Sequence, residues 1–252
     1  MTERVRILNG SIDAVTLARA TDSLIERARR GERGWVATIN VAILMTMRKD
    51  GFLQGFAERA CLSLADGQPL VWTGRLFGAP LPERVTGIDL MVDLCARAAQ
   101  AGLPVYLLGA APGVAREAAA RLKAQFPGLR VAGTADGYFP DADAQQRARA
   151  VRESGAAILF VAMGVPRQER FIEQHWEALG ASVVVPVGGS FDVLADRVAR
   201  APRLLQKLGL EWAFRLAQEP RRLWRRYLVT NAAFVTLVCA ELVLGQRTRR
   251  PI

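Results

Sequence analysis

Short apolar runs alternate with longer amphipathic stretches through the middle of the chain. The apolar runs are typical of buried strands, and the amphipathic stretches are typical of helices. Strands are predicted at residues 36–40, 104–109, 129–133, 156–164 and 182–189, and helices at 85–102, 112–127, 141–155 and 166–180. Regular alternation with continuous apolar strands predicts an α/β fold, in which helices cover both faces of a mostly parallel sheet.

A different pattern occupies residues 200–227, which are basic and aromatic. Pro220 suits the first turn of a helix, so one helix is predicted before it and another from it onward. At about 100° per residue, the second helix is divided into two faces. One half carries Arg221, Arg222, Arg225 and Arg226, and the other carries Leu223, Trp224, Tyr227 and Leu228. This pattern favours a helix lying on an anionic bilayer surface, with a docked surface helix as the alternative.

Residues 228–245 form an 18-residue apolar run. As a helix this run would be about 27 Å long, slightly less than the ~30 Å hydrocarbon core of a bilayer. Asn231 and Glu241 interrupt it, and an acidic side chain at the bilayer centre costs about 3 kcal/mol. The pattern therefore favours a helix in the membrane plane or packed on protein over one that spans.

The charge is concentrated at the C-terminus. Residues 203–252 carry ten Lys and Arg against three Glu, so this segment holds +7 of the chain's net charge of +10. The nearly neutral body has no basic stripe of its own, which argues against nucleic acid as a partner. We expect a body at residues 1–199 and a helical appendage at 200–252.

Other compositional features restrict the chemistry. The start of the chain lacks the apolar region of a signal peptide. Cys61, Cys95 and Cys239 are scattered, which fits buried thiols in a reducing compartment better than disulfides or zinc ligands. His175 is the single histidine, which excludes a His-rich metal site. We expect it within the helix at 166–180, on a packed or solvated face.

Polar residues follow several of the predicted strands. Parallel sheets bind ligands at the carboxyl ends of their strands. Each residue also has a structural explanation: Asp66 as a turn former, Arg84 as a surface cation, and Gln168 with Glu169 as residues of a first helical turn. Gly109 begins LGAAPG, whose backbone amides could hold a phosphate where a helix starts. The candidate residues for one ligand-binding edge of the sheet are Thr38, Asn40, Asp66, Arg84, Gln168 and Glu169.

The segment DAD at 141–143 resembles the D-x-D that holds a metal–diphosphate in many glycosyltransferases. Here it follows Pro140 and begins a predicted helix, where Asp is favoured as an N-cap and first-turn residue. We therefore expect no metal site at this position.

Eight segments in this order resemble the WecG/TagA/CpsF glycosyltransferases, from about residue 8 to 228. They are TIN, LADGQPLV, RVTGIDL, LGAAPG, DGYF, GVPRQE, VGGSFDVLADRVARAP and GLEWAFRLAQEPRRLWRRY. The resemblance implies a Rossmann-like domain with a C-terminal appendage that meets the membrane. It also implies inverting transfer of a sugar from a UDP donor to a polyprenyl-diphosphate-linked sugar, on the cytoplasmic face of the inner membrane.

The resemblance also implies roles for individual residues. Asp66 falls on the proposed base, and Tyr138 lies in a motif near the nucleotide. Active-site positions of the family fall on Thr38, Asn40, Arg84 and Gln168, and Arg215, Arg222 and Arg225 match appendage arginines thought to reach the diphosphate. Asp196 departs from the family, which often has Gly there, and leaves the local turn open.

The implied chemistry needs one base for the acceptor hydroxyl and positive charge on the leaving diphosphate. Arginines can supply that charge, so neither a metal nor another cofactor is expected. A nucleotide-binding oxidoreductase would need G-x-G-x-x-G, which LGAAPG is not. A non-catalytic scaffold of polysaccharide assembly is the alternative. The donor sugar (N-acetylmannosamine, its uronic acid or glucose), the acceptor sugar and a homo-oligomeric state stay open.

Overall fold

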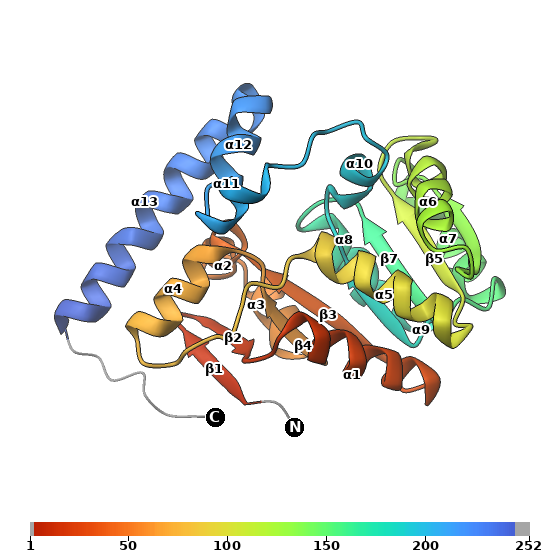
Figure 1. The fold of residues 1–252 in the computed structure, drawn as a ribbon, viewed down its shortest axis with the longest axis horizontal. Coiled ribbons are helices and arrows are strands. Elements are labelled where there is room, and N and C mark those ends of the chain that lie inside the picture. Colours follow the sequence, from red (N-terminus) through yellow and green to blue (C-terminus); the bar gives the residue numbers. More distant parts are fainter. Residues whose placement is uncertain (1–2, 245–252) are drawn as a thin grey trace. The chain divides into compact units, whose positions relative to one another are not determined.

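The computed structural model describes residues 3–244 (Figure 1). The chain divides into two compact units. The first unit contains residues 1–16, 38–86 and 200–252, and the second contains 17–37 and 87–199. Residues of the C-terminal appendage thus group with two earlier segments. The division into 1–199 and 200–252 stays a prediction about independent folding, which a truncation tests.

A six-stranded parallel sheet flanked by helices confirms the predicted α/β fold. The strand order is β4-β3-β8-β7-β5-β6. The strands are β3 (Gly34–Ile39), β4 (Leu62–Ala65), β5 (Val105–Gly109), β6 (Val131–Ala135), β7 (Ile158–Ala162) and β8 (Val183–Pro186). The strands β5, β7 and β8 are buried at every residue, which is why they are continuous apolar runs in the sequence.

The helices of the second unit bury one face each. They are α1 (Leu17–Arg29), α5 (Gly87–Ala101), α6 (Val114–Gln125), α7 (Ala144–Glu153), α8 (Arg167–Gln174), α9 (Trp176–Leu179) and α10 (Ser190–Leu194). Helix α1 packs against α5, α6 against α10, and α7 against α9. Small residues such as Ala98, Ala118 and Ala148 are fully buried on these helices and allow close packing.

The first unit begins with an antiparallel hairpin of β1 (Arg4–Ile7) and β2 (Gly10–Asp13). Asp13 is buried, pairs with Arg4 at 3.2 Å, and accepts the backbone N–H of Ser63 at 2.7 Å. Because Ser63 belongs to β4, this carboxylate fixes the hairpin to that strand. The helices of the earlier segments are α2 (Val41–Met47), α3 (Gly51–Glu58) and α4 (Gln68–Leu76).

The appendage contributes three helices to the same unit. They are α11 (Arg203–Lys207), α12 (Glu211–Gln218) and α13 (Pro220–Leu244). The predicted break at Pro220 is confirmed, but the amphipathic and apolar segments after it form one continuous helix. In Figure 1, α13 runs alongside α2, against which it packs. Among the described side chains of α13, Leu223 and Phe234 are buried.

Part of α13, Leu223–Val243, is long and apolar enough to cross a membrane by length and composition alone. Its mean hydropathy is 1.4, and 6% of the window is buried. This segment starts five residues before the predicted apolar run and includes Arg225 and Arg226. Its relation to a bilayer stays a prediction.

Two predicted helices differ from the structure. The helix at 141–155 starts with one 3-10 turn (η1, Asp141–Asp143), and the Asp143 side chain makes no capping hydrogen bond. The helix predicted at 166–180 is divided into α8 and α9 by His175. The expectation that His175 lies within a helix is therefore wrong, because it occupies the junction between two.

Candidate active site

Two backbone hydrogen bonds hold the predicted base at the end of β4. The N–H of Asp66 donates to the carbonyl of Ile39 at 2.7 Å, and the N–H of Val85 donates to the carbonyl of Ala65 at 2.9 Å. The residue after Ile39 is Asn40, and the residue before Val85 is Arg84. The carboxyl end of β4 therefore lies between the segments that carry these two predicted residues.

Asn40 lies where β3 becomes α2. Its Oδ1 accepts the N–H of Ile43 at 3.0 Å and caps the helix, which leaves the Nδ2 end of the amide as a donor. A Cβ placed on Gly67, the residue after Asp66, would lie 3.9 Å from the Cβ of Asn40. Thr38 is half-buried near the end of β3. The capping role was not predicted, although Asn before a helical run is a common signal for it.

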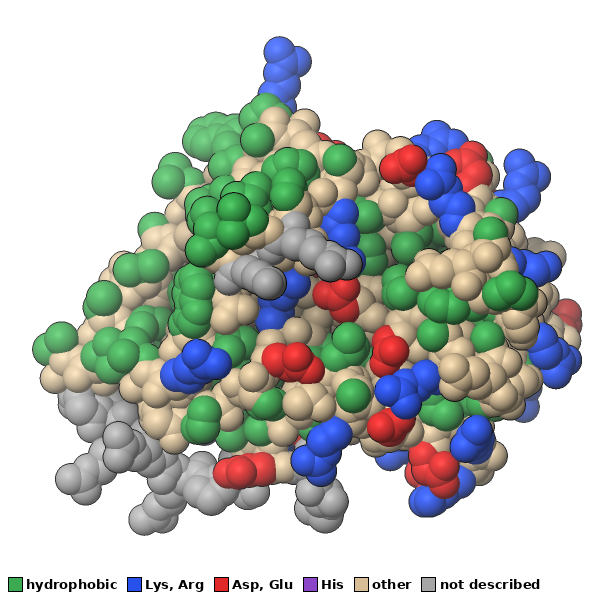
Figure 2. Space-filling view, in the orientation of Figure 1, with side chains coloured by type: hydrophobic (Ala, Val, Ile, Leu, Met, Phe, Trp, Pro, Cys, Tyr) green, Lys and Arg blue, Asp and Glu red, His purple; other side chains and the backbone are tan. Residues whose placement is uncertain are grey.

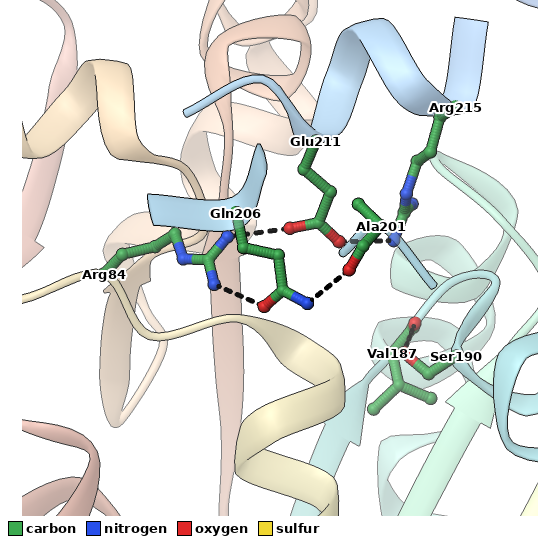
Figure 3. Close-up of polar contacts among 7 residues, drawn as sticks. All are labelled: Arg84, Val187, Ser190, Ala201, Gln206, Glu211 and Arg215. Carbon is green, nitrogen blue, oxygen red and sulfur yellow. Dashed lines mark hydrogen bonds and ion pairs between the residues drawn. The ribbon is translucent and has the colours of Figure 1, made fainter. Parts of the chain in front are cut away.

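Arg84 makes a well-formed ion pair with the appendage. Its Nη1 lies 2.7 Å from Oε2 of Glu211 at the start of α12, and the two side chains are 15% and 16% exposed. Its Nη2 donates to Oε1 of Gln206 at 3.3 Å, and Nε2 of Gln206 donates to the carbonyl of Ala201 at 2.7 Å (Figure 3). Arg84 is therefore part of a half-buried network and is not the surface cation that the alternative supposed.

Glu211 also pairs with a second predicted arginine. Nη2 of Arg215, one turn later on α12, lies 3.5 Å from Oε1 of Glu211, so the carboxylate bridges Arg84 and Arg215 (Figure 3). Arg225 is exposed on α13, with its guanidinium 5.2 Å from the ring centroid of Trp224. The side chain of Arg222 lies outside the described part of the structure.

The backbone conformation and close packing at position 109, at the end of β5, require glycine. Its φ is +141°, and a Cβ there would lie 2.3 Å from the carbonyl oxygen of Ala162 on β7. The next residue, Ala110, donates its N–H to the same oxygen at 2.7 Å. The loop ends at Gly113, which precedes α6 without a side-chain cap. Without a capping side chain at this position, no cap competes with an anion for the N–H groups in the first turn of α6. Phosphate binding there stays a prediction.

The loop after β6 is attached to the loop after β5. The N–H of Gly137 donates to the carbonyl of Ala110 at 2.9 Å, and a Cβ on Gly137 would lie 3.1 Å from the Cα of Gly109. Tyr138 is 73% exposed beside this junction. An exposed aromatic ring on a fixed loop is a suitable surface for stacking a base.

Two arginines that the sequence did not single out hold this loop. Arg167 donates from Nη2 to the carbonyl of Phe139 at 3.1 Å, and its guanidinium lies 5.3 Å from that ring. Arg147 lies 5.5 Å from the same ring and pairs with Asp136 at 3.7 Å. Arg167 adjoins Gln168 in GVPRQE, but nothing in the spacing relates it to a residue 28 positions earlier.

Gln168 lies in the first turn of α8, as predicted. It is buried there, and both ends of its amide contact protein groups. Its Oε1 accepts the N–H of Gly188 at 3.2 Å, and its Nε2 donates to Oε1 of Glu169 at 2.8 Å. The first bond fixes the loop that follows β8. Gln168 therefore orders a strand-end loop, and direct substrate contact by it stays a prediction.

Burial shifts the pKa values of three groups in the second unit. It raises the pKa of the Cys95 thiol to about 12, so this cysteine stays protonated and is a poor nucleophile. It also raises the pKa of Tyr106 and lowers that of His175. His175 is therefore neutral at pH 7, with Nδ1 3.0 Å from Oε1 of Gln145 and its ring centroid 5.1 Å from that of Phe171.

Asp141 and Asp143 are exposed in η1. Among residues 3–244, no three His, Cys, Asp or Glu side chains are grouped to hold a metal ion.

Asp196, the departure from the family, has a φ of +62°. Asp tolerates this left-handed conformation better than most residues, which explains how it can stand where the family often has Gly.

The predicted residues are divided between the two units. The first unit contains Thr38, Asn40, Asp66, Arg84, Arg215, Arg222 and Arg225, and Glu211 and Gln206 join Arg84 there. The second contains Gly109, Tyr138 and Gln168 and adds Arg147 and Arg167. A hint of Glu211 was available, because it precedes Arg215 by four residues on a predicted helix, the spacing of a helical ion pair.

Comparisons with known proteins identify the family of the chain. Residues 5–248 match the glycosyl transferase WecG/TagA/CpsF family. A protein of Bacillus spizizenii (strain ATCC 23059 / NRRL B-14472 / W23) is 36% identical over 194 residues, which cover 77% of this chain and 74% of the relative. That relative is an N-acetylglucosaminyldiphosphoundecaprenol N-acetyl-beta-D-mannosaminyltransferase. The chain is therefore a member of the WecG/TagA/CpsF family of glycosyltransferases.

Proposed function

We propose that this enzyme transfers a sugar from a UDP-sugar to a polyprenyl-diphosphate-linked sugar, with inversion, during assembly of a cell-surface polysaccharide. The observation that carries the proposal is the placement of Asp66 between the Asn40 and Arg84 segments at the end of β4, in a member of this family. The named relative favours N-acetylmannosamine as the sugar transferred and an N-acetylglucosaminyl-diphospho-polyprenol as the acceptor.

The reaction needs one base. In our proposal the carboxylate of Asp66 takes the proton of the acceptor hydroxyl, and the hydroxyl oxygen attacks the anomeric carbon of the donor. The bond from that carbon to the UDP oxygen breaks, and UDP leaves with the bonding electron pair. A positioned general base contributes about 10²–10⁴ in rate. Attack opposite the leaving group inverts the anomeric centre.

The departing diphosphate needs positive charge. Arg84 and Arg215 are candidates because Glu211 holds both guanidinium groups at fixed positions in the first unit. Arginine presents paired N–H donors that match phosphate oxygens, so it can stabilise the leaving group as the charge develops. Arg222 and Arg225 would add to this charge from α13. Tyr138 and the Gly109 loop would hold the nucleotide.

A turnover screen tests the proposal. Purified enzyme is incubated with individual UDP-sugars and a short-chain polyprenyl-diphosphate N-acetylglucosamine, and UDP release and product mass are measured. We expect product with UDP-N-acetylmannosamine, and its anomeric configuration by NMR should be opposite to that of the donor. Binding of UDP without product from any of the three candidate donor sugars would contradict the proposal.

A further inference from the structure

Large apolar side chains are exposed mainly on one compact unit. Among residues 3–244, all but one of these exposed side chains lie in the first unit, and Tyr138 is the exception. Figure 2 shows hydrophobic side chains gathered over α11 and α12 and along α13. Two of the exposed side chains, Trp72 and Leu76, belong to α4 in the body of the enzyme and not to the appendage.

Helix α4 presents these residues on a defined face. Leu70, Val71, Thr73 and Gly74 are buried. Trp72 and Leu76, one turn apart, are 48% and 56% exposed. Arg75 is exposed beside them. A Cβ on Gly74 would lie 2.7 Å from the carbonyl oxygen of Ala79, so the opposite side of the helix is packed closely against the segment that follows it.

The exposed face of α4 is continuous with the appendage. A Cβ on Gly209, in the turn between α11 and α12, would lie 2.9 Å from Cη2 of Trp72 and 3.0 Å from the Cβ of Gln68. Leu208 and Leu210, on either side of Gly209, are 51% and 38% exposed. The two apolar surfaces therefore meet with no space between them.

We propose that α4 is part of the membrane-docking surface and that Trp72, Arg75 and Leu76 contact an anionic bilayer together with the appendage helices. A bilayer is favoured over a protein partner because exposed arginines flank the apolar side chains. Arg75 lies on α4, and Arg221 and Arg225 lie on α13. Aromatic anchors with adjacent cations are typical of segments that lie at an anionic interface.

This inference rests on the proposed function. In that reaction the acceptor is a membrane lipid, so docking on the bilayer would bring the enzyme to its acceptor. Helix α4 begins two residues after Asp66 and is nine residues long, so its exposed face lies within about 13 Å of the predicted base along the helix. A bilayer that touches Trp72 and Leu76 would present a lipid-linked diphosphate sugar near Asp66. Docking through α13 alone would not determine that the lipid-linked sugar lies near Asp66.

An environment-sensitive fluorophore tests the contact in the full-length chain. The partly exposed Cys61 and the exposed Cys239 are replaced by Ser, Leu76 is replaced by Cys, and the new thiol is labelled with NBD. Vesicles of 70% phosphatidylcholine and 30% phosphatidylglycerol should shift the emission to the blue and increase it at least twofold. The same label at Ala124, an exposed position on α6 of the second unit, should not change.

A variant without a label provides a second measurement. Trp72→Gln with Leu76→Gln should weaken vesicle binding at least tenfold and reduce turnover of a long-chain acceptor in vesicles. Turnover of a short, water-soluble acceptor should be unchanged, which also verifies that the variant is folded. Vesicle binding can be measured even if no donor is turned over, so failure of the proposed function is distinguishable from failure of this inference.

Three results would overturn the inference. The first is an unchanged NBD signal at position 76 on vesicles that bind the protein, because the appendage alone would then dock. The second is wild-type vesicle binding by the double variant. The third is a wild-type dimer in sedimentation that the double variant converts to monomer without loss of vesicle binding, because the α4 face would then bind a second copy of the chain.

Discussion

The guanidinium of Arg84 and the carboxylate of Glu211 form an ion pair of 2.7 Å between residues 127 positions apart in the sequence. The pair joins the loop before α5 to the first turn of α12. Both groups are largely shielded from water, so the pair resists screening by salt better than a surface pair would. The appendage is thus connected to the body through a predicted active-site residue.

We predict that Glu211→Gln lowers stability by about 1–3 kcal/mol, because it leaves the Arg84 guanidinium shielded without its carboxylate. It should also lower kcat for a water-soluble acceptor at least tenfold, since Arg84 and Arg215 lose the group that orients them. Urea denaturation and steady-state kinetics measure the two effects. The control is Glu117→Gln, which breaks the exposed Arg197 pair and should change neither quantity appreciably. Equal effects of the two variants would contradict the orienting role.

Asp66→Asn should reduce turnover at least a hundredfold, because the amide cannot accept the hydroxyl proton and a general base contributes about 10²–10⁴ in rate. Affinity for UDP, measured by calorimetry, should stay within a few-fold. Asp143→Asn is the matched control at an exposed position and should keep full turnover. If Asp66→Asn were nearly as active as the wild type, the base would have to be sought elsewhere.

Gly109→Ala should prevent stable folding or lower stability by several kcal/mol, because the new Cβ would lie 2.3 Å from the Ala162 carbonyl oxygen. Gly102→Ala is the control, since Gly102 also has a positive φ, of 67°, but nothing lies within 4 Å of its Cβ position. That change should cost only the ~1–2 kcal/mol of the left-handed conformation. Urea midpoints give both values, and similar losses for both variants would show that crowding at Gly109 is unimportant.

The sequence predicted the central elements of the sheet because strands buried on both faces are continuous apolar runs, as in ILFVA of β7. It did not predict β1, β2, β4, α1 to α4 or α10. The short strand β1 alternates polar and apolar residues over only 4 positions, too few for a period to be recognised. Helices α2 and α3 are separated only by Arg48 to Asp50, so no clear loop marks them.

The candidate site shows the same limit. Residues at strand ends, such as Asn40 and Asp66, are recognisable because ligands of parallel sheets bind at that edge. The Arg84–Glu211 and Arg167–Phe139 contacts join distant segments, and no local pattern encodes them. The position of His175 was missed for a related reason. The residues on both sides of His175 have a helical pattern, so the sequence does not show that α8 ends and α9 begins there.

Activity should survive excess EDTA if arginines neutralise the leaving diphosphate, and Asp141→Ala with Asp143→Ala should reduce turnover by less than threefold. The two carboxylates are exposed in η1, where they make the first turn leading into α7. Turnover with and without EDTA, measured on the wild type and the double variant, tests this. Loss of activity on chelation with rescue by Mn²⁺ or Mg²⁺ would restore the metal-binding interpretation of this segment.

Truncation after Arg200 tests the roles of the appendage together. All strands of the sheet precede this point, so the body should stay folded and soluble. Its Tm should fall, because Arg84 loses Glu211 and α2 loses the packing of α13, on which Leu223 and Phe234 are buried. An insoluble or unfolded product would contradict an independent body at residues 1–199.

The truncated enzyme should also lose vesicle binding. Each basic residue near an anionic surface contributes about 1 kcal/mol, so binding of the intact chain should weaken steeply with salt. Turnover of a water-soluble acceptor should be lost as well, since Arg215 and Arg225 are removed. A control, Leu228→Gln with Val229→Gln, alters exposed apolar residues of α13 and keeps both arginines. It should weaken vesicle binding and spare soluble turnover. If the truncated enzyme instead kept soluble turnover, the appendage would be an anchor only, and its arginines would have no part in the chemistry.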